Sequence, residues 1–294
     1  MNSLDFGGTA HLIYEYGYFK DKKISVGCGG SLANTLFWLN FFKNKVLIRG
    51  ILGDDNLGKI LNEEYLKFSN KEIIVQKGAK SAGLHYYIDK KGNIIKVNFN
   101  YGITNRVEKL SVFPTNCRVN IIGGFELENA KQIKQKDNLC SFNGDTIVLN
   151  LGGLTDVQKF YWFLKRANNF KNLIIVGNNK EVKNLSNKNI THHNYILIIT
   201  QGNKGAELFY KKDHILYSGV TKSRKKIIDT IGAGDGLLAM FLDQWYKSNQ
   251  TFYLKDLKKI LKKAVNFGTL ISTYYGARPH LSVSDLFIYP TCPS

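Results

Sequence analysis

The hydrophobic positions in the middle of the chain form short, continuous apolar runs at 119–122, 146–149 and 173–176. Amphipathic segments with helical spacing separate them, at 126–135 and 157–167. Continuous apolar runs are typical of strands buried on both faces, and alternation of strands with helices is typical of a parallel sheet covered by helices. We therefore predict an α/β fold with a mostly parallel central sheet flanked by helices.

A second pattern alternates apolar and polar residues. It appears at 13–16 and 23–26, and again at 84–88 and 94–99, where the two runs flank the turn sequence 89–93. Alternation with period two is typical of strands that have one exposed face, and a polar turn containing Gly predicts a hairpin. We expect these runs to form a small separate sheet.

A glycine-rich turn between an apolar pair and a long apolar segment stands at Asp229-Thr230-Ile231-Gly232-Ala233-Gly234-Asp235. Amides at the start of a helix, with no bulky side chain in front of them, form an anion site that the helix dipole strengthens. A carboxylate at that site, Asp235, could take a proton from a hydroxyl nucleophile. The alternative is a plain turn in which Asp235 only caps the helix.

This stretch resembles the signature of the PfkB, or ribokinase-like, carbohydrate kinases. The resemblance implies a ribokinase-like three-layer fold and transfer of a phosphoryl group from ATP. It further implies that Asp235 is the catalytic base and that the amides of Gly232, Ala233 and Gly234 form the anion hole. Family members also often use K⁺, which would lie near Asp229.

Three further motifs follow the family order. Gly29-Gly30-Ser31-Leu32-Ala33-Asn34 is similar to the first signature, and 178–181 and 200–205 are similar to the Asn-x-x-Glu and Thr-x-Gly-x-x-Gly motifs. The resemblance implies that the first binds substrate, the second holds Mg²⁺ through water and the third contacts the nucleotide. The residues concerned are Gly29, Gly30 and Asn34, then Asn178 and Glu181, then Thr200, Gly202 and Gly205. Asn178 and Glu181 also fit a local capping box.

Asp5 matches the family's substrate-binding Asp in its distance to Gly29-Gly30. In the family that Asp follows a buried strand, and the sequence before Asp5 has no residues for one. We expect either a misplaced start or a sheet that has lost its first strand.

The resemblance also implies a β-lid that closes over the acceptor and offers a dimer surface. We expect one kinase domain over 1–294, with lid segments at about 9–27 and 82–100. A lid excludes water during phosphoryl transfer.

Composition adds limits. The formal charge of +18 comes from scattered lysines, so nucleic-acid binding is not expected. The 4 cysteines form no Cys-x-x-Cys pair. The amino terminus has no basic region followed by an apolar run, as an export signal would have, and no apolar stretch is long enough to cross a membrane. We expect a cytoplasmic protein with reduced thiols.

The sequence therefore predicts an ATP- and Mg²⁺-dependent kinase that acts on a hydroxyl of a sugar. One alternative is a nucleoside kinase of the same fold. Another is a catalytically idle relative retained as a binding protein, which the +18 charge and the missing first strand motivate.

Overall fold

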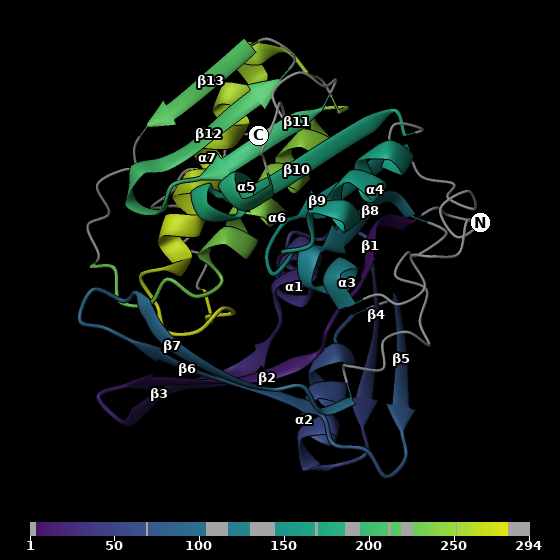
Figure 1. Cartoon of the computed structure of the whole chain (residues 1–294), viewed down its shortest axis with the longest axis vertical. Helices are drawn as coiled ribbons and strands as arrows, with labels where there is room; N and C mark the ends of the chain where they lie inside the picture. Colours follow the sequence, from purple (N-terminus) through teal and green to yellow (C-terminus); the bar gives the residue numbers. More distant parts are fainter. Residues whose placement is uncertain are drawn as a thin grey trace.

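The computed structural model describes residues 4–68, 70–103, 117–129, 145–167, 170–185, 195–210, 213–218, 226–250 and 252–281. Two sheets organise this part of the chain, a large one at the centre and a small one beside it (Figure 1).

The larger sheet contains nine strands, and those from β11 to β5 are parallel, which confirms the predicted mostly parallel sheet. At one edge β12 and β13 run antiparallel. From that edge to the other, the strands are β13 (Asp213–Ser218), β12 (Gly205–Tyr210), β11 (Ile196–Thr200), β10 (Asn172–Asn178), β9 (Thr146–Asn150), β8 (Cys117–Gly123), β1 (Leu4–Thr9), β4 (Val46–Gly53) and β5 (Asn70–Gln76).

Helices cover both faces of this sheet. Alternate residues of one strand enter different cores: Val148 packs with α6 and α7, whereas Leu149 packs with Phe160 of α4. This explains the unbroken apolar runs. The helices are α1 (Ser31–Phe41), α2 (Asn56–Tyr65), α3 (Gly124–Asn129), α4 (Val157–Ala167), α5 (Asn179–Leu185), α6 (Ala233–Lys247) and α7 (Leu254–Ile271). Of the helix expected at 126–135, positions beyond 129 lie outside the described residues.

The first strand is present, which corrects the expectation that it is missing. β1 includes Asp5 and lies between β4 and β8. Its glycine pair hid it from pattern analysis, yet Gly8 is required by packing: a Cβ there would lie 2.7 Å from the Ile121 carbonyl oxygen and 3.1 Å from Leu32. Glycine lets the strand approach its neighbours closely.

The smaller sheet has the order β3–β2–β6–β7, formed by β3 (Lys22–Gly29), β2 (Ile13–Phe19), β6 (Ala82–Ile88) and β7 (Ile94–Asn100). The predicted hairpin is confirmed. Its turn is closed by the Asp89 carboxylate, which accepts hydrogen bonds from the backbone of Lys91 and Asn93. Figure 1 shows this sheet below the start of α6. We call it the lid sheet.

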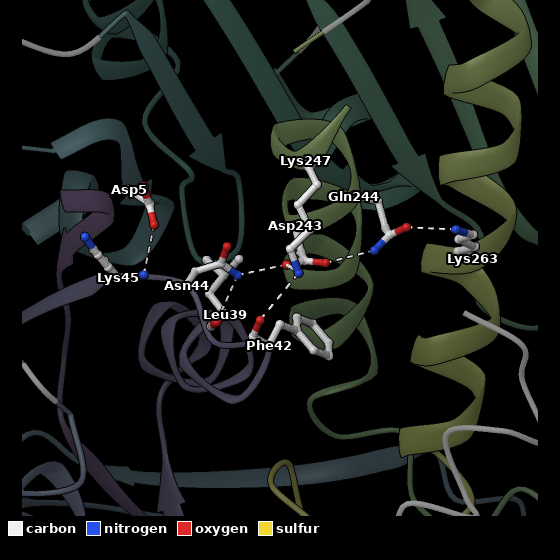
Figure 2. A network of polar contacts seen from close by, with 9 residues as sticks. All are labelled: Asp5, Leu39, Phe42, Asn44, Lys45, Asp243, Gln244, Lys247 and Lys263. Carbon is white, nitrogen blue, oxygen red and sulfur yellow. Dashed lines mark hydrogen bonds and ion pairs between the residues drawn. The ribbon is translucent and has the colours of Figure 1, made fainter. Parts of the chain in front are cut away.

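A polar network around the buried Asp243 fixes α6 against its neighbours (Figure 2). Asp243 is 2% exposed and accepts hydrogen bonds from Asn44 (2.9 Å) and Gln244 (2.9 Å), and Lys247 forms an ion pair with it (2.6 Å). Lys263 of α7 donates to Gln244 (2.8 Å). Because these bonds join α6 to α7 and to the turn that follows α1, they restrain the helix whose first turn carries Asp235.

Among the described residues, no helix combines the length and apolar character that a membrane span requires.

Candidate active site

Asp235 lies in the first turn of α6, where the predicted glycine turn meets the helix. Gly232 is the N-cap with φ 72°, and a Cβ there would lie 2.6 Å from the Cα of Ala277, so both backbone angle and space require glycine. Gly234 faces open space: a Cβ there would have no neighbour within 4 Å. The backbone at Gly234, in the first turn of α6, therefore borders a space that an anion can enter.

The Asp235 carboxylate accepts two side-chain hydrogen bonds from α1. Ser31 Oγ donates to Oδ1 (2.5 Å) and Asn34 Nδ2 donates to Oδ2 (3.0 Å). Asn150 Nδ2, at the end of β9, donates to Ser31 Oγ (3.0 Å). Burial nevertheless raises the pKa of Asp235 to about 6, against the lowering effect of both hydrogen bonds. A carboxylate of this kind is ionised near neutral pH and is basic enough to accept a proton.

Arg278 sets the orientation of Asn34. Its Nε donates to Asn34 Oδ1 (2.8 Å), and because a guanidinium only donates, the amide nitrogen must face Asp235. Arg278 also donates to Tyr65 Oη (3.2 Å), and its guanidinium carbon lies 5.0 Å from the ring centroid of Phe37. Arg278 was not among the predicted site residues, and it is 244 residues from Asn34 in the chain.

Glu15 holds the glycine pair from the lid sheet. Its Oε1 accepts a hydrogen bond from the amide of Gly30 (3.0 Å), and Gly30 has φ 94°. A Cβ on Gly29 would lie 1.8 Å from the Glu15 carboxyl carbon, so this position requires glycine. Burial raises the pKa of Glu15 to about 7, and the negative charge of Asp235 contributes to the rise. The alternating pattern at 13–16 predicted Glu15 only as a strand residue.

His11 and Glu126 form a buried pair beyond the carboxyl end of β1, 2% and 6% exposed. Glu126 Oε1 lies 2.9 Å from the backbone nitrogen of His11 and 3.0 Å from its Nδ1. Although burial opposes ionisation, the contacts with His11 outweigh it and lower the pKa of Glu126. The Glu126 charge in turn raises the pKa of Asp235, so the two carboxylates act on each other.

The structure corrects the placement expected for Asp5. Asp5 is near the amino end of β1, where it accepts hydrogen bonds from the amide of Lys45 (3.0 Å) and the hydroxyl of Tyr246 (2.8 Å). Thr9 ends the strand, and at about 3.3 Å per residue Asp5 lies roughly 13 Å from that end. The residue at the site end is His11. The distance in sequence from Asp5 to Gly29-Gly30 therefore predicted the wrong end of β1 for Asp5.

Asn178 and Glu181 form the reciprocal capping box that was the alternative interpretation. The backbone amide of Asn178 donates to Glu181 Oε2 (2.8 Å), and the backbone amide of Glu181 donates to the Asn178 side-chain oxygen, Oδ1 (2.9 Å). Glu181 Oε1 and Asn150 Oδ1 lie 4.0 and 3.6 Å from the position of a Cβ on Gly152, so both face the same space. This donor set fits Mg²⁺ held largely through water. Among the described residues, no group of three His, Cys, Asp or Glu could hold a metal directly.

The predicted nucleotide turn follows β11. Thr200 pairs with Asn178 across β10 and β11, so this turn and the Asn178 motif lie at adjacent strand ends. Gly202 has φ 60° with open space in front of it, and Gly205 has φ 93° and accepts a hydrogen bond from the Gln201 amide (2.8 Å). Ligands in such sheets bind beyond the carboxyl ends of the parallel strands.

Asp229 is completely buried at the start of the motif. Its Oδ1 accepts from the Ile231 amide (2.9 Å), and its Oδ2 accepts from the Tyr86 hydroxyl (2.9 Å) and the Gly276 amide (2.9 Å). Burial raises its pKa despite these bonds. Because a carboxylate has about four acceptor positions, three donors leave little room for a cation, and the expected K⁺ has no support here.

Parts of the chain are similar in sequence to known carbohydrate kinases. A family model described as pfkB family carbohydrate kinase matches residues 160–283. A curated protein of Mycoplasma genitalium, described as putative 1-phosphofructokinase, is 38% identical over 79 residues, which are 26% of this chain and 23% of that protein. The predicted resemblance to the PfkB family is confirmed. The matched stretch of that relative is under a quarter of its length.

Solved structures of a probable sugar kinase and of a nucleoside kinase described as a member of the ribokinase family share the fold. A probable sugar kinase from Rhizobium etli superposes with a TM-score of 0.78 at 15% identity, covering 97% of this chain and 98% of that one. A nucleoside kinase from Methanocaldococcus jannaschii has a TM-score of 0.73 at 18% identity, covering 93% of each chain. The ribokinase-like fold is thereby confirmed.

Proposed function

We propose that the chain transfers the γ-phosphoryl group of ATP to a hydroxyl, most simply a primary one, of a sugar or sugar-like acceptor. The observation that carries this is the Asp235 carboxylate, held by Ser31 and Asn34 at the start of α6 beside the open space at Gly234. A base and a set of amide donors then meet at one point.

In the proposed reaction Asp235 accepts the hydroxyl proton of the acceptor. The acceptor oxygen bonds to the γ-phosphorus as the bond from that phosphorus to the ADP oxygen breaks. Amides of Gly232, Ala233 and Gly234 donate to the transferring oxygens. When bound, Mg²⁺ neutralises phosphate charge, and Glu181 would hold it through water.

Acceptor binding is proposed for Gly29, Gly30 and Asn34. Glu15 and Glu126 add acidic groups nearby: the Asp235 charge raises the pKa of Glu15, and the Glu126 charge raises the pKa of Asp235. Carboxylates and an amide accept hydrogen bonds from several hydroxyls at once, which suits a neutral polyol. Nucleotide contacts are proposed for Thr200, Gly202 and Gly205.

A nucleoside acceptor is the second candidate, because aromatic rings gather beside His11. The ring centroid of Phe125 lies 4.6 Å from that of His11. The ring centroids of Phe99, in β7, and Tyr101, just after β7, lie 5.7 and 6.1 Å from that of Phe125. Flat aromatic rings stack on a base as readily as on one another. This cluster favours a ring-bearing acceptor.

We also propose a cytoplasmic location and a homodimer that forms through the lid sheet. The described cysteines, Cys28 and Cys117, are unpaired, which suits a reducing compartment. Strand β7 is an edge strand whose Ile95 and Val97 are 68% and 51% exposed. An exposed apolar edge is commonly covered by a partner.

A substrate screen tests the activity. Purified protein with ATP and Mg²⁺ is assayed for ADP release against neutral sugars, nucleosides and sugar phosphates, and each product is identified by phosphorus NMR. Phosphorylation of a sugar or nucleoside hydroxyl supports the proposal, and the preferred class separates the two candidates. ADP release with no phosphorylated acceptor in any class contradicts it.

A further inference from the structure

The lid sheet is hydrogen-bonded to the phosphoryl-transfer loop. Tyr86 of β6 donates from its hydroxyl to Oδ2 of Asp229 (2.9 Å), and both residues are completely buried although they are 143 positions apart. Ser25 of β3 lies 2.7 Å from the same hydroxyl and fixes its position. A hydrogen bond to a carboxylate is stronger than one between neutral groups, particularly where water is excluded.

The hairpin turn of the lid makes a second connection. The carbonyl oxygen of Gly92 accepts hydrogen bonds from the amide (3.1 Å) and hydroxyl (2.9 Å) of Thr230. A Cβ on Gly92, which has φ 78°, would lie 2.7 to 2.9 Å from backbone atoms of Ile228 and Asp229. Only glycine lets the two backbones meet this closely.

A second glycine makes room for the tyrosine. Gly17 stands at a bulge of β2, and a Cβ there would lie 2.3 Å from Ser25 Oγ and 2.6 Å from the Tyr86 hydroxyl. The absence of a side chain at Gly17 therefore leaves room for the Tyr86 hydroxyl that donates to Asp229.

Asp229 transmits the contact to the anion hole. Its other oxygen accepts from the Ile231 amide, one residue before the Gly232 turn, and its Oδ2 also accepts from the Gly276 amide. One buried carboxylate thus joins the lid sheet, the glycine turn and the segment after α7. Movement of Tyr86 away from Asp229 removes one of its three donors and loosens the loop that presents the amides.

We propose that Tyr86 is a positioning residue that makes the anion hole depend on closure of the lid sheet. This inference rests on the proposed function for its kinetic consequence. With the lid closed, the hydroxyl of Tyr86 and the carbonyl of Gly92 hold the loop in shape for transfer and water is excluded. With the lid open, the loop is released, the amides are not aligned for transfer, and water can reach the site.

The test compares Tyr86→Phe with Tyr87→Phe. Tyr87 is the next residue of β6 on the opposite face, where it stacks on Tyr18 at 5.1 Å, and phenylalanine keeps that stacking. We expect Tyr86→Phe to lower kcat by about tenfold, the loss of one hydrogen bond to a charged group, with the KM for ATP changed less than about twofold. In Tyr86→Phe the share of ADP formed without phosphorylated acceptor should also rise. Tyr87→Phe should match the wild type in kcat and in this share.

Hydrogen exchange gives a readout that needs no substrate. Amides 89–93 and 229–233 should exchange faster in Tyr86→Phe than in Tyr87→Phe, while those of α7 stay unchanged. Equal kcat, equal hydrolysis share and equal exchange in the two variants would overturn the proposal, even if Tyr86→Phe melts at a lower temperature. If Tyr86→Phe does not fold, Ser25→Ala replaces it, with the same direction and a smaller effect.

Failure of the two proposals can be told apart. If the wild-type protein phosphorylates no acceptor, the proposed function fails, and faster exchange at 229–233 still supports the coupling. If the wild type is active but Tyr86→Phe behaves as Tyr87→Phe, only the coupling fails.

Discussion

Asn34 donates a hydrogen bond of 3.0 Å to the Asp235 carboxylate, although 201 residues separate them. The contact joins the first helix to the last motif, and Arg278 orients the amide that makes it. Asp235 is therefore a positioned carboxylate between α1 and α6, which is the arrangement a general base requires. Two of about four acceptor positions on the carboxylate are taken, so an incoming hydroxyl can donate to a remaining one.

The pH dependence of activity follows from the raised pKa of Asp235. Burial raises that pKa to about 6, and a general base acts only when ionised, so kcat/KM should rise with pH, reach half its maximum near pH 6 and level off above pH 7. The measurement is an initial-rate profile from pH 5 to 8. Glu15→Gln is the control, because it removes the neighbouring group with a pKa of about 7 and should leave the limb near pH 6 in place. A flat profile would count against Asp235 as the base.

Arg278→Lys tests the orientation of Asn34. Lysine keeps the charge but loses the fixed fork that holds both Asn34 and Tyr65, so the amide is no longer aligned on Asp235. We expect kcat to fall by about tenfold, the cost of one misplaced donor to a charged group. The matched control is Arg166→Lys on α4, which packs over Trp162 and should have wild-type kcat. Equal kcat in the two variants would show that Arg278 does not act through Asn34.

Glu15→Gln tests the cost of a buried carboxylate. The pKa of Glu15 is raised from 4.5 to about 7, so between these values the native protein keeps a proton that the unfolded chain has released. Wild-type stability therefore falls as pH rises through this window, by up to about 3 kcal/mol. Glutamine has no charge and can still accept from the Gly30 amide. The variant should gain stability relative to wild type at pH 8 and little at pH 4.5.

Urea unfolding of both proteins at these two pH values measures the difference. The same free-energy difference at pH 4.5 and pH 8 would contradict the assigned cause, because only ionisation of Glu15 makes the difference depend on pH.

Local patterns predicted the strands, helices and glycine turns, because periodicity and turn chemistry are local properties. They did not predict β1, since Gly7 and Gly8 carry no side chain to register as apolar, although Gly8 is packed against Ile121 and Leu32. They placed Asp5 at the wrong end of that strand. Arg278, Glu15 and the His11 and Glu126 pair were missed, because each acts through a partner far away in sequence, and pairing across such distances is set by the fold.

The turnover of Asp235→Asn tests the central claim most directly. Asparagine is nearly isosteric: its oxygen can still accept from Asn34, and its amide nitrogen can donate to Ser31 Oγ, so the fold and substrate binding should survive while the base is lost. On the acceptor found by the screen we expect kcat to fall about a hundredfold or more, with a KM for ATP close to wild type. Wild-type turnover in Asp235→Asn would contradict the account.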